Sequence, residues 1–267
     1  LPPLALAGYR GLFALPMLLG VVAMRGRRAG ELPWRQVAAS PWAWMGAASY
    51  GVMVVAFVVA TKLTTAANAI FIQYTSPAYV ALLSWPLLRE RVTWRDGVAC
   101  TGVLAGMVLF FSGDLSASAR AGNVVAVVSS FGAAGLPLAL RADQRRHASD
   151  EHVALVAPAL AIAAGDVLGV VACAPAMAAS PPPDARAWAL VVALGLLQIG
   201  LPYVLYATAM PRLTALEGSL LPTLEPILNP VWVVLATGET PGRAAMLGGA
   251  CVLGSIVFQA CVPRRRE

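Results

Sequence analysis

Long apolar stretches separated by short polar ones run through the whole chain. They consist mainly of alanine, leucine, valine and glycine, without the alternation of apolar and polar positions that is typical of a membrane β-barrel. A helix needs about 20 consecutive apolar residues to cross the hydrocarbon core, and these stretches are roughly that long. The pattern therefore predicts an all-α, polytopic membrane protein with nine spans, at residues 4–24, 42–62, 67–88, 95–112, 122–140, 153–175, 188–209, 215–236 and 243–262.

The second half of the chain repeats the first. SPAYVALLSWPLLRERVTWRDG begins just before Pro77, EPILNPVWVVLATGETPGRAAM begins just before Pro226, and an offset of 149 residues relates the two segments. We predict one repeat with four spans at 1–112, a linker at 113–121 and a second repeat with five spans at 122–267. Two repeats of five helices have inverted topologies. We therefore expect a further helix before Leu1; the alternative is a genuine nine-helix protein.

Composition and charge agree with a membrane protein and indicate its orientation. Only 12% of the residues are charged, whereas a soluble domain has about 25%. Of the 19 basic residues, all fall on one predicted side except Lys62, Arg120, Arg186, Arg243 and the intramembrane Arg10. The positive-inside rule places that side, with the C-terminus, on the cytoplasmic face of the membrane. We expect this membrane to be a bacterial inner membrane. The net charge of +6 follows from this bias, and we expect no nucleic-acid partner.

Each half also contains the same succession of motifs: a mid-span proline, an acidic turn and a glycine-rich last span. These are Pro77, LLRERVT at 87–93 and three glycines in one half, and LEP at 224–226, ATGETPG at 236–242 and three glycines in the other. This pattern resembles the EamA-type branch of the drug/metabolite transporter superfamily, and it covers essentially the whole chain. The resemblance implies a ten-helix exporter or permease. Departures from the family pattern are the absent first helix, Arg89 in place of a glycine, and Ser76 where the second half has Glu225.

The two mid-span prolines identify the helices that we expect to line a central site. Pro77 and Pro226 each remove a backbone donor and so free the carbonyl groups of Gln73 and Pro222. Freed carbonyl groups are tolerated in a membrane where they line a cavity buried in protein or filled with water. The alternative is a kinked helix that contacts no ligand.

Glu225 is the strongest single candidate for a functional residue. It lies near the middle of its span, where a charge costs roughly 2.5–3.5 kcal/mol on insertion scales. Desolvation favours the neutral form of a carboxyl group, so Glu225 suits either proton coupling or binding of a substrate ammonium group. Asn229 shares its helix face. The alternative role is a hydrogen bond that fixes helix packing.

Other intramembrane residues are weaker candidates. Asp166 lies in mid-span, and Arg10 either reaches the membrane surface or faces the cavity as a counter-ion. Glu217 fits a capping box with Thr214, and Glu90 is expected to pair with neighbouring arginines or to cap a helix. Aromatic residues could form a stacking surface for substrate, although mid-span aromatic residues usually serve packing: Tyr50, Phe57, Phe71, Tyr74, Tyr203 and Tyr206. The GxxxG run that ends at Gly106 serves either an internal helix contact or a dimer face.

The sequence favours transport over catalysis. It contains no phosphate-binding loop and no metal-ligand spacing, so we expect no ATP-driven pumping, metal or cofactor. We predict a secondary transporter for a small metabolite, such as an amino acid or a related amphiphile, with efflux as its direction and protons as a candidate coupling ion. A membrane scaffold or sensor of the same fold is the alternative. A monomer is expected, with a dimer as the alternative.

Overall fold

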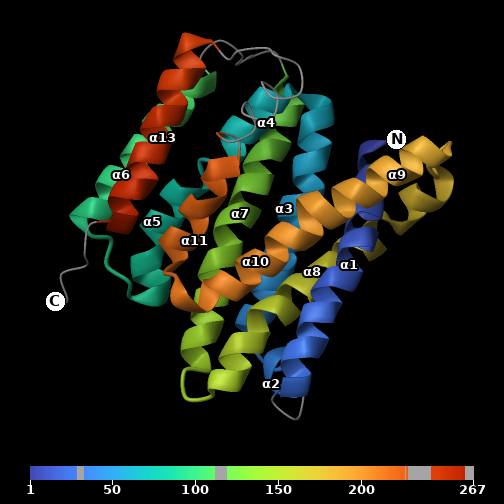
Figure 1. Cartoon of the computed structure of the whole chain (residues 1–267), viewed down its shortest axis with the longest axis horizontal. Coiled ribbons are helices and arrows are strands. Elements are labelled where there is room, and N and C mark those ends of the chain that lie inside the picture. Colours follow the sequence, from blue (N-terminus) through green and yellow to red (C-terminus); the bar gives the residue numbers. More distant parts are fainter. Residues whose placement is uncertain (29–32, 112–118, 226, 228–241, 262–267) are drawn as a thin grey trace.

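The computed structural model describes residues 1–28, 33–111, 119–225, 227 and 242–261, and the regular structure in them is helical (Figure 1). The first half contains α1 (Pro3–Arg28), α2 (Trp34–Ala38), α3 (Pro41–Leu63), α4 (Ala66–Gln73), α5 (Ser76–Leu88) and α6 (Trp94–Phe111). The second contains α7 (Arg120–Arg146), α8 (Glu151–Ala179), α9 (Ala185–Ala193), the π-helix η1 (Leu194–Gly200), α10 (Leu201–Ala209), the 3₁₀ turns η2 (Met210–Arg212) and η3 (Leu221–Thr223), α11 (Ala215–Leu220) and α13 (Arg243–Cys261).

The predicted spans coincide with these helices wherever the structure describes them. Among the described helices, five are long and apolar enough to cross a membrane by themselves: those at 3–26, 41–63, 120–146, 151–179 and 185–212. The third predicted span is divided into α4 and α5, and the seventh combines α9, η1 and α10. The five-residue helix α2 was not predicted, because a single turn is too short to produce a periodic pattern. Most of the predicted linker at 113–121 lies outside the described residues.

The offset between the repeats recurs in the helices. Helix α4 begins at Ala66 and α11 at Ala215, and Thr65 and Thr214 cap the two N-termini through their side chains. The capping box predicted for Thr214 and Glu217 is present. By the same offset α1 corresponds to α8, α3 to the segment from α9 to α10, and α6 to α13.

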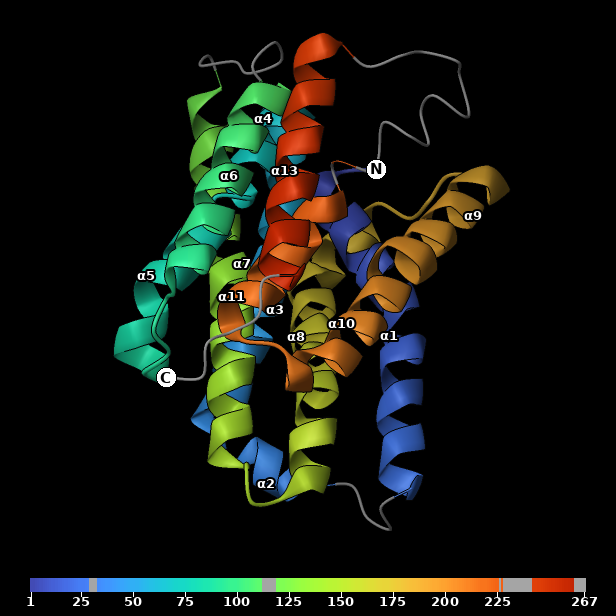
Figure 2. The same ribbon diagram turned by 60° about the vertical axis from the view of Figure 1, so that its left-hand side comes forward.

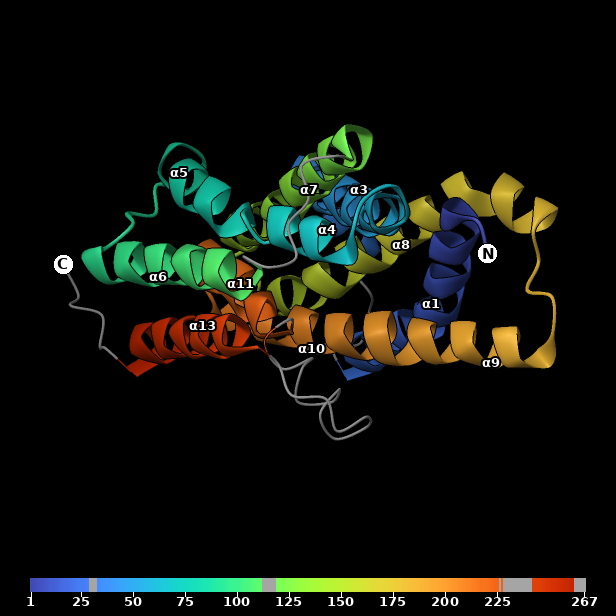
Figure 3. The ribbon, with the colours of Figure 1, turned by 90° about the horizontal axis from the view of Figure 1, so that it is seen from above.

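The two repeats have inverted topologies, as predicted. Helices α6 and α13 lie side by side in all three views (Figures 1, 2 and 3). The Sγ atom of Cys251 lies 3.4 Å from the carbonyl oxygen of its own repeat equivalent, Gly102. A contact between equivalent positions lies on the pseudo-two-fold axis, and the helices run antiparallel, since Gly106 meets Gly248 while Gly102 meets Ser255. The other equivalent pair, α1 and α8, is also in contact. The GxxxG run therefore serves an internal contact.

Helix α7 belongs to the second repeat but packs mainly on the first. It contacts α3, α4 and α5 (Figure 3). A Cβ atom added to Gly132 would lie 2.7 Å from the carbonyl oxygen of Ser49, so the two helix backbones approach closely only because Gly132 has no side chain. The segment from α9 to α10, which corresponds to α3, is less covered by other helices. Of its most apolar 18-residue stretch 22% is buried, against 44% for α3.

Arg89 adopts a backbone conformation that is costly for a residue with a side chain. It ends α5 in the left-handed conformation, with φ 55°, and is the only described non-glycine residue with a positive φ. This conformation costs an L-residue about 1–2 kcal/mol, whereas glycine adopts it freely. We expect Arg89→Gly to raise the free energy of unfolding in detergent by about 1 kcal/mol. Arg91→Gly, in the loop that follows, is the control; a loss of stability in Arg89→Gly would contradict the argument.

Candidate functional site

Two interrupted helices bring Tyr74 and Glu225 together. Helix α4 ends at Gln73, and α5 begins at Ser76 with Pro77 in its first turn, where the missing N–H group is tolerated. In the second repeat α11 tightens into the 3₁₀ turn η3, and Leu224 and Glu225 follow in helical conformation. The Tyr74 hydroxyl group donates a hydrogen bond of 3.3 Å to Oε2 of Glu225. The first helix predicted to be broken is interrupted at Tyr74 and Thr75. The second changes from an α-helix to a 3₁₀ turn just before Glu225, while Pro226, where its break was predicted, lies outside the described residues.

Arg10 approaches the same place from α1. Its side chain is buried, with 8% of the residue exposed, and its Nε atom has no hydrogen-bond partner among the described residues. The guanidinium group lies near Tyr50 and Tyr203, and close enough to Glu225 for the two opposite charges to interact. Of the two predicted locations for Arg10, the structure shows the interior one. A cation and a carboxylate from different repeats thus share one buried region.

Tyrosine side chains line this region. The rings of Tyr50 on α3 and Tyr203 on α10 meet edge to face with their centroids 4.7 Å apart. Tyr206 lies one helical turn further on, with its ring centroid 6.2 Å from that of Tyr203. Its hydroxyl group is near Gly218 of α11. These rings lie beside the charges of Arg10 and Glu225, so the region combines apolar faces with one charge of each sign.

The π-helix η1 is a feature that the sequence analysis missed. A Cβ atom added to Gly195 would lie 2.7 Å from the carbonyl oxygen of Arg10, and one added to Gly200 would lie 2.8 Å from Sδ of Met17. The wide turn therefore lies directly against α1 at Arg10 and precedes Tyr203 by a few residues. Single π-helical turns occur frequently at functional sites. The two glycines of LGLLQIG were the available signal.

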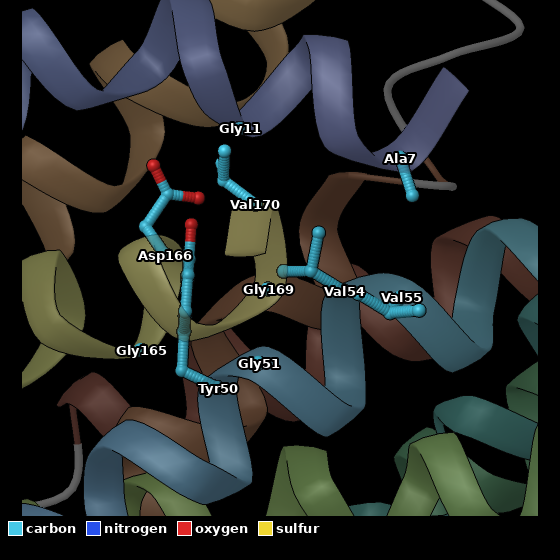
Figure 4. A pocket seen from close by; sticks show the side chains of 10 residues that line it. All are labelled: Ala7, Gly11, Tyr50, Gly51, Val54, Val55, Gly165, Asp166, Gly169 and Val170. Atoms are coloured by element: carbon cyan, nitrogen blue, oxygen red, sulfur yellow. The ribbon is translucent and has the colours of Figure 1, made fainter. Parts of the chain in front are cut away.

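Asp166 lies in a small cavity beside this region (Figure 4). It is on α8, only 3% exposed, and its Oδ2 atom has no hydrogen-bond partner among the described residues. The cavity is formed between α1, α3 and α8, and its lining includes the Tyr50 side chain and four glycines: Gly11, Gly51, Gly165 and Gly169.

The structure places the remaining candidates elsewhere. The amide group of Gln73 donates to Oγ of Ser129 on α7, at 2.8 Å. Phe57 packs against Ala60, Ala69 and Ala126, at the contact of α3 with α4 and α7. Pro77 is buried at the start of α5. Pro226 and Asn229 lie outside the described residues. The roles in substrate binding or coupling that the sequence predicts for these five residues stay predictions.

Polar contacts also hold α4 and α5 to α7 at both ends. At one end Oγ1 of Thr64 and Nδ2 of Asn68 both donate to Oδ1 of Asn123 on α7, at 2.9 and 3.2 Å. Nδ2 of Asn68 also lies 3.1 Å from Oγ1 of Thr64. At the arginine-rich end Glu90 accepts hydrogen bonds from Nε of Arg141 at 2.8 Å and Nη2 of Arg145 at 2.9 Å. The predicted pairing of Glu90 with arginine is confirmed, although the partners come from α7 and are distant in sequence.

We expect Glu90→Gln to lower the free energy of unfolding, because it replaces two charge-assisted hydrogen bonds with weaker ones. Glu90 is 13% exposed while Arg145 is 44% exposed, so the loss should be about 1–2 kcal/mol. Unfolding in detergent followed by circular dichroism measures it. Glu151→Gln, at the exposed start of α8, is the matched control, and equal stability of the two variants would contradict the assignment.

Comparison with known proteins agrees with this architecture. A crystal structure of another protein superposes on this chain with a TM-score of 0.75 at 20% sequence identity. The match covers 99% of this chain and 90% of the other, which shows a shared fold. No curated protein matches the chain. The model of the EamA-like transporter family matches residues 1–112 and again residues 120–260. The chain, a membrane protein of two inverted helical repeats, therefore belongs to the EamA-like transporter family.

Proposed function

We propose that this membrane transporter carries a small metabolite with both charged and apolar parts, and that Arg10, Tyr74 and Glu225 bind it. The contact between Tyr74 and Glu225 carries the proposal, because it joins the interrupted helices of the two repeats. In transporters built from inverted repeats, substrate binds at the repeat interface among broken helices, and one repeat rocks against the other. No step of this mechanism needs catalysis or ATP.

Departures from symmetry support the choice of residues. At the positions that correspond to Arg10, Asp166 and Glu225, the other repeat has Ala159, Met17 and Ser76, and none of these carries a charge. A scaffold built from two copies of one helical unit would be stable with apolar residues at all of these positions. Charges inside a membrane are costly and are typically retained for function. This argues against the alternative of a scaffold or sensor.

The charge pattern suggests the kind of substrate. Arg10 suits a carboxylate group, Glu225 suits an ammonium group, and the rings of Tyr50, Tyr203 and Tyr206 suit an apolar body. An amino acid or a related amphiphile has these parts. The distribution of arginine supports a C-terminus on the cytoplasmic side of the inner membrane. We further propose efflux as the direction and a proton gradient as the driving force.

Counterflow into proteoliposomes tests the proposal. Purified protein is reconstituted with each unlabelled compound of a metabolite panel inside the vesicles, and entry of a trace of the labelled compound is measured with and without a pH gradient. We expect accumulation of one or a few zwitterionic amphiphiles. No accumulation of any compound by protein that is folded in the vesicles would favour the scaffold or sensor.

A further inference from the structure

Asp166 presents a buried polar group that the proposed substrate site does not use. Its Oδ2 atom and the hydroxyl group of Tyr50 both lack a hydrogen-bond partner among the described residues, and Tyr50 is fully buried. Figure 4 shows the Tyr50 hydroxyl group pointing from α3 toward the Asp166 carboxyl group on α8. A buried polar atom left without a partner costs about 1–3 kcal/mol. Two such atoms that face one cavity indicate a small ligand between them.

The cavity is too small for a metabolite. The volume open to the centre of a water molecule is about 10 Å³, close to the lower limit for holding a single water and far below the roughly 300–1,000 Å³ of a ligand pocket. Its walls cannot easily retreat, because Gly51 and Gly165 keep α3 and α8 in backbone contact: a Cβ atom on Gly165 would lie 2.3 Å from the carbonyl oxygen of Ala47. Only a water molecule or a proton fits here.

No cation forms an ion pair with Asp166 among the described residues. The titratable groups that face this region are Tyr50 of α3, Tyr203 of α10 and Arg10 of α1, and the charge that Arg10 lies near is that of Glu225. Other charged residues on the described helices that pack against α8 lie toward helix ends: Arg25, Arg27, Arg28, Arg35, Lys62, Arg120, Arg141, Asp143, Arg145, Arg146 and Arg212. An isolated buried carboxylate takes up a proton instead of remaining charged.

We propose that Asp166 is a reversible proton-binding site, with one water molecule between its carboxyl group and the Tyr50 hydroxyl group, and that substrate binds apart from it at Arg10 and Glu225. The division of roles rests on the proposed transport function, whereas proton binding itself does not. Asp166 lies where α8 meets its repeat equivalent α1: a Cβ atom on Gly11 would be 2.9 Å from its Oδ1 atom. The neutral acid suits this closed contact, and the anion favours separation of α1 from α8, which admits water. Protonation can thus bias the rocking of the repeats.

Infrared difference spectroscopy of the protein in lipid vesicles, with the proton itself as the probe, tests this site. We expect a carboxylic-acid C=O band at neutral pH that converts into a carboxylate band as the pH rises. The band should shift on carbon-13 labelling of aspartate, disappear in Asp166→Asn and remain in Glu225→Gln. Tyr50→Phe should move its frequency without removing it, because one hydrogen-bond partner of the carboxyl group or its water is lost.

Two results would overturn the proposal: wild-type protein whose acid bands do not respond to aspartate labelling, and an aspartate band that persists unchanged in Asp166→Asn. The labelling experiment uses the unmodified sequence, so the absence of an aspartate acid band would overturn the proposal even if Asp166→Asn does not fold. The outcome is also separate from the counterflow screen. Proton binding at Asp166 without transport would refute only the proposed function, and transport without this band would refute only the proton site.

Discussion

Glu225→Gln is expected to lower counterflow of the compound found by the screen by roughly tenfold to a hundredfold, while the protein still folds. The substitution keeps the size of the side chain and removes its charge. Hydrogen bonds to a charged group are worth about 1.5–3 kcal/mol, which corresponds to that range in affinity. The residue contacts Tyr74 at the junction of the interrupted helices, so, under the proposed function, the lost charge acts directly on the ammonium group of the substrate.

Two variants make this result specific. Tyr74→Phe removes the hydroxyl group that donates to Glu225 and should cause a smaller loss, because the carboxylate remains. Glu151→Gln removes a carboxylate at the exposed start of α8 and should leave counterflow unchanged. Transport by Glu225→Gln equal to that of the wild type at every pH would exclude Glu225 from the mechanism.

Gly165→Val is expected to be among the most destabilising single substitutions in the described helices. Its Cβ atom would lie 2.3 Å from the carbonyl oxygen and 3.0 Å from the Cα atom of Ala47, and both are backbone atoms of α3. A backbone cannot move aside as a side chain does, so α3 and α8 must separate along their contact. We expect a loss of about 3 kcal/mol in the free energy of unfolding, the upper part of the range for overpacking.

Gly169→Val, one turn further along α8, is the matched control. A Cβ atom there would be 3.6 Å from Cγ2 of Val55, an ordinary contact with a side chain that can adjust. Unfolding of both variants in detergent, followed by circular dichroism, gives the comparison. Equal stability of Gly165→Val and Gly169→Val would show that α3 and α8 are not packed as closely as described.

The features that could be predicted from sequence are those that depend on short segments. The lengths of apolar stretches located the spans, Pro77 indicated an interrupted helix, and Thr214 with Glu217 indicated a helix start. Each of these depends on a chemical preference within one or two helical turns. The π-helix lies outside this class, because what it packs against, the Arg10 backbone, is distant in sequence.

The assembly of the candidate site was only partly predictable, because equivalent positions of the two repeats need not lie close together. Phe57 and Tyr206 are equivalent positions, and equivalent positions meet only where they lie on the two-fold axis, as Gly102 and Cys251 do. Phe57 instead packs with Ala60, Ala69 and Ala126, whereas Tyr206 lies beside Tyr203. The approach of Arg10 to Glu225 likewise depends on the packing of whole helices, which no local pattern encodes.

The position of α7 has a consequence for how the protein is made. This helix is synthesised after α3, α4 and α5, yet it supplies the surface on which they pack. Gly132 against Ser49, Asn123 against Asn68 and Arg141 against Glu90 all form across this contact. The early helices therefore enter the membrane before the α7 partners of Asn68 and Glu90 have been made. During that interval a nascent chain that ends before α7 should be a preferred target for membrane chaperones and quality-control proteases.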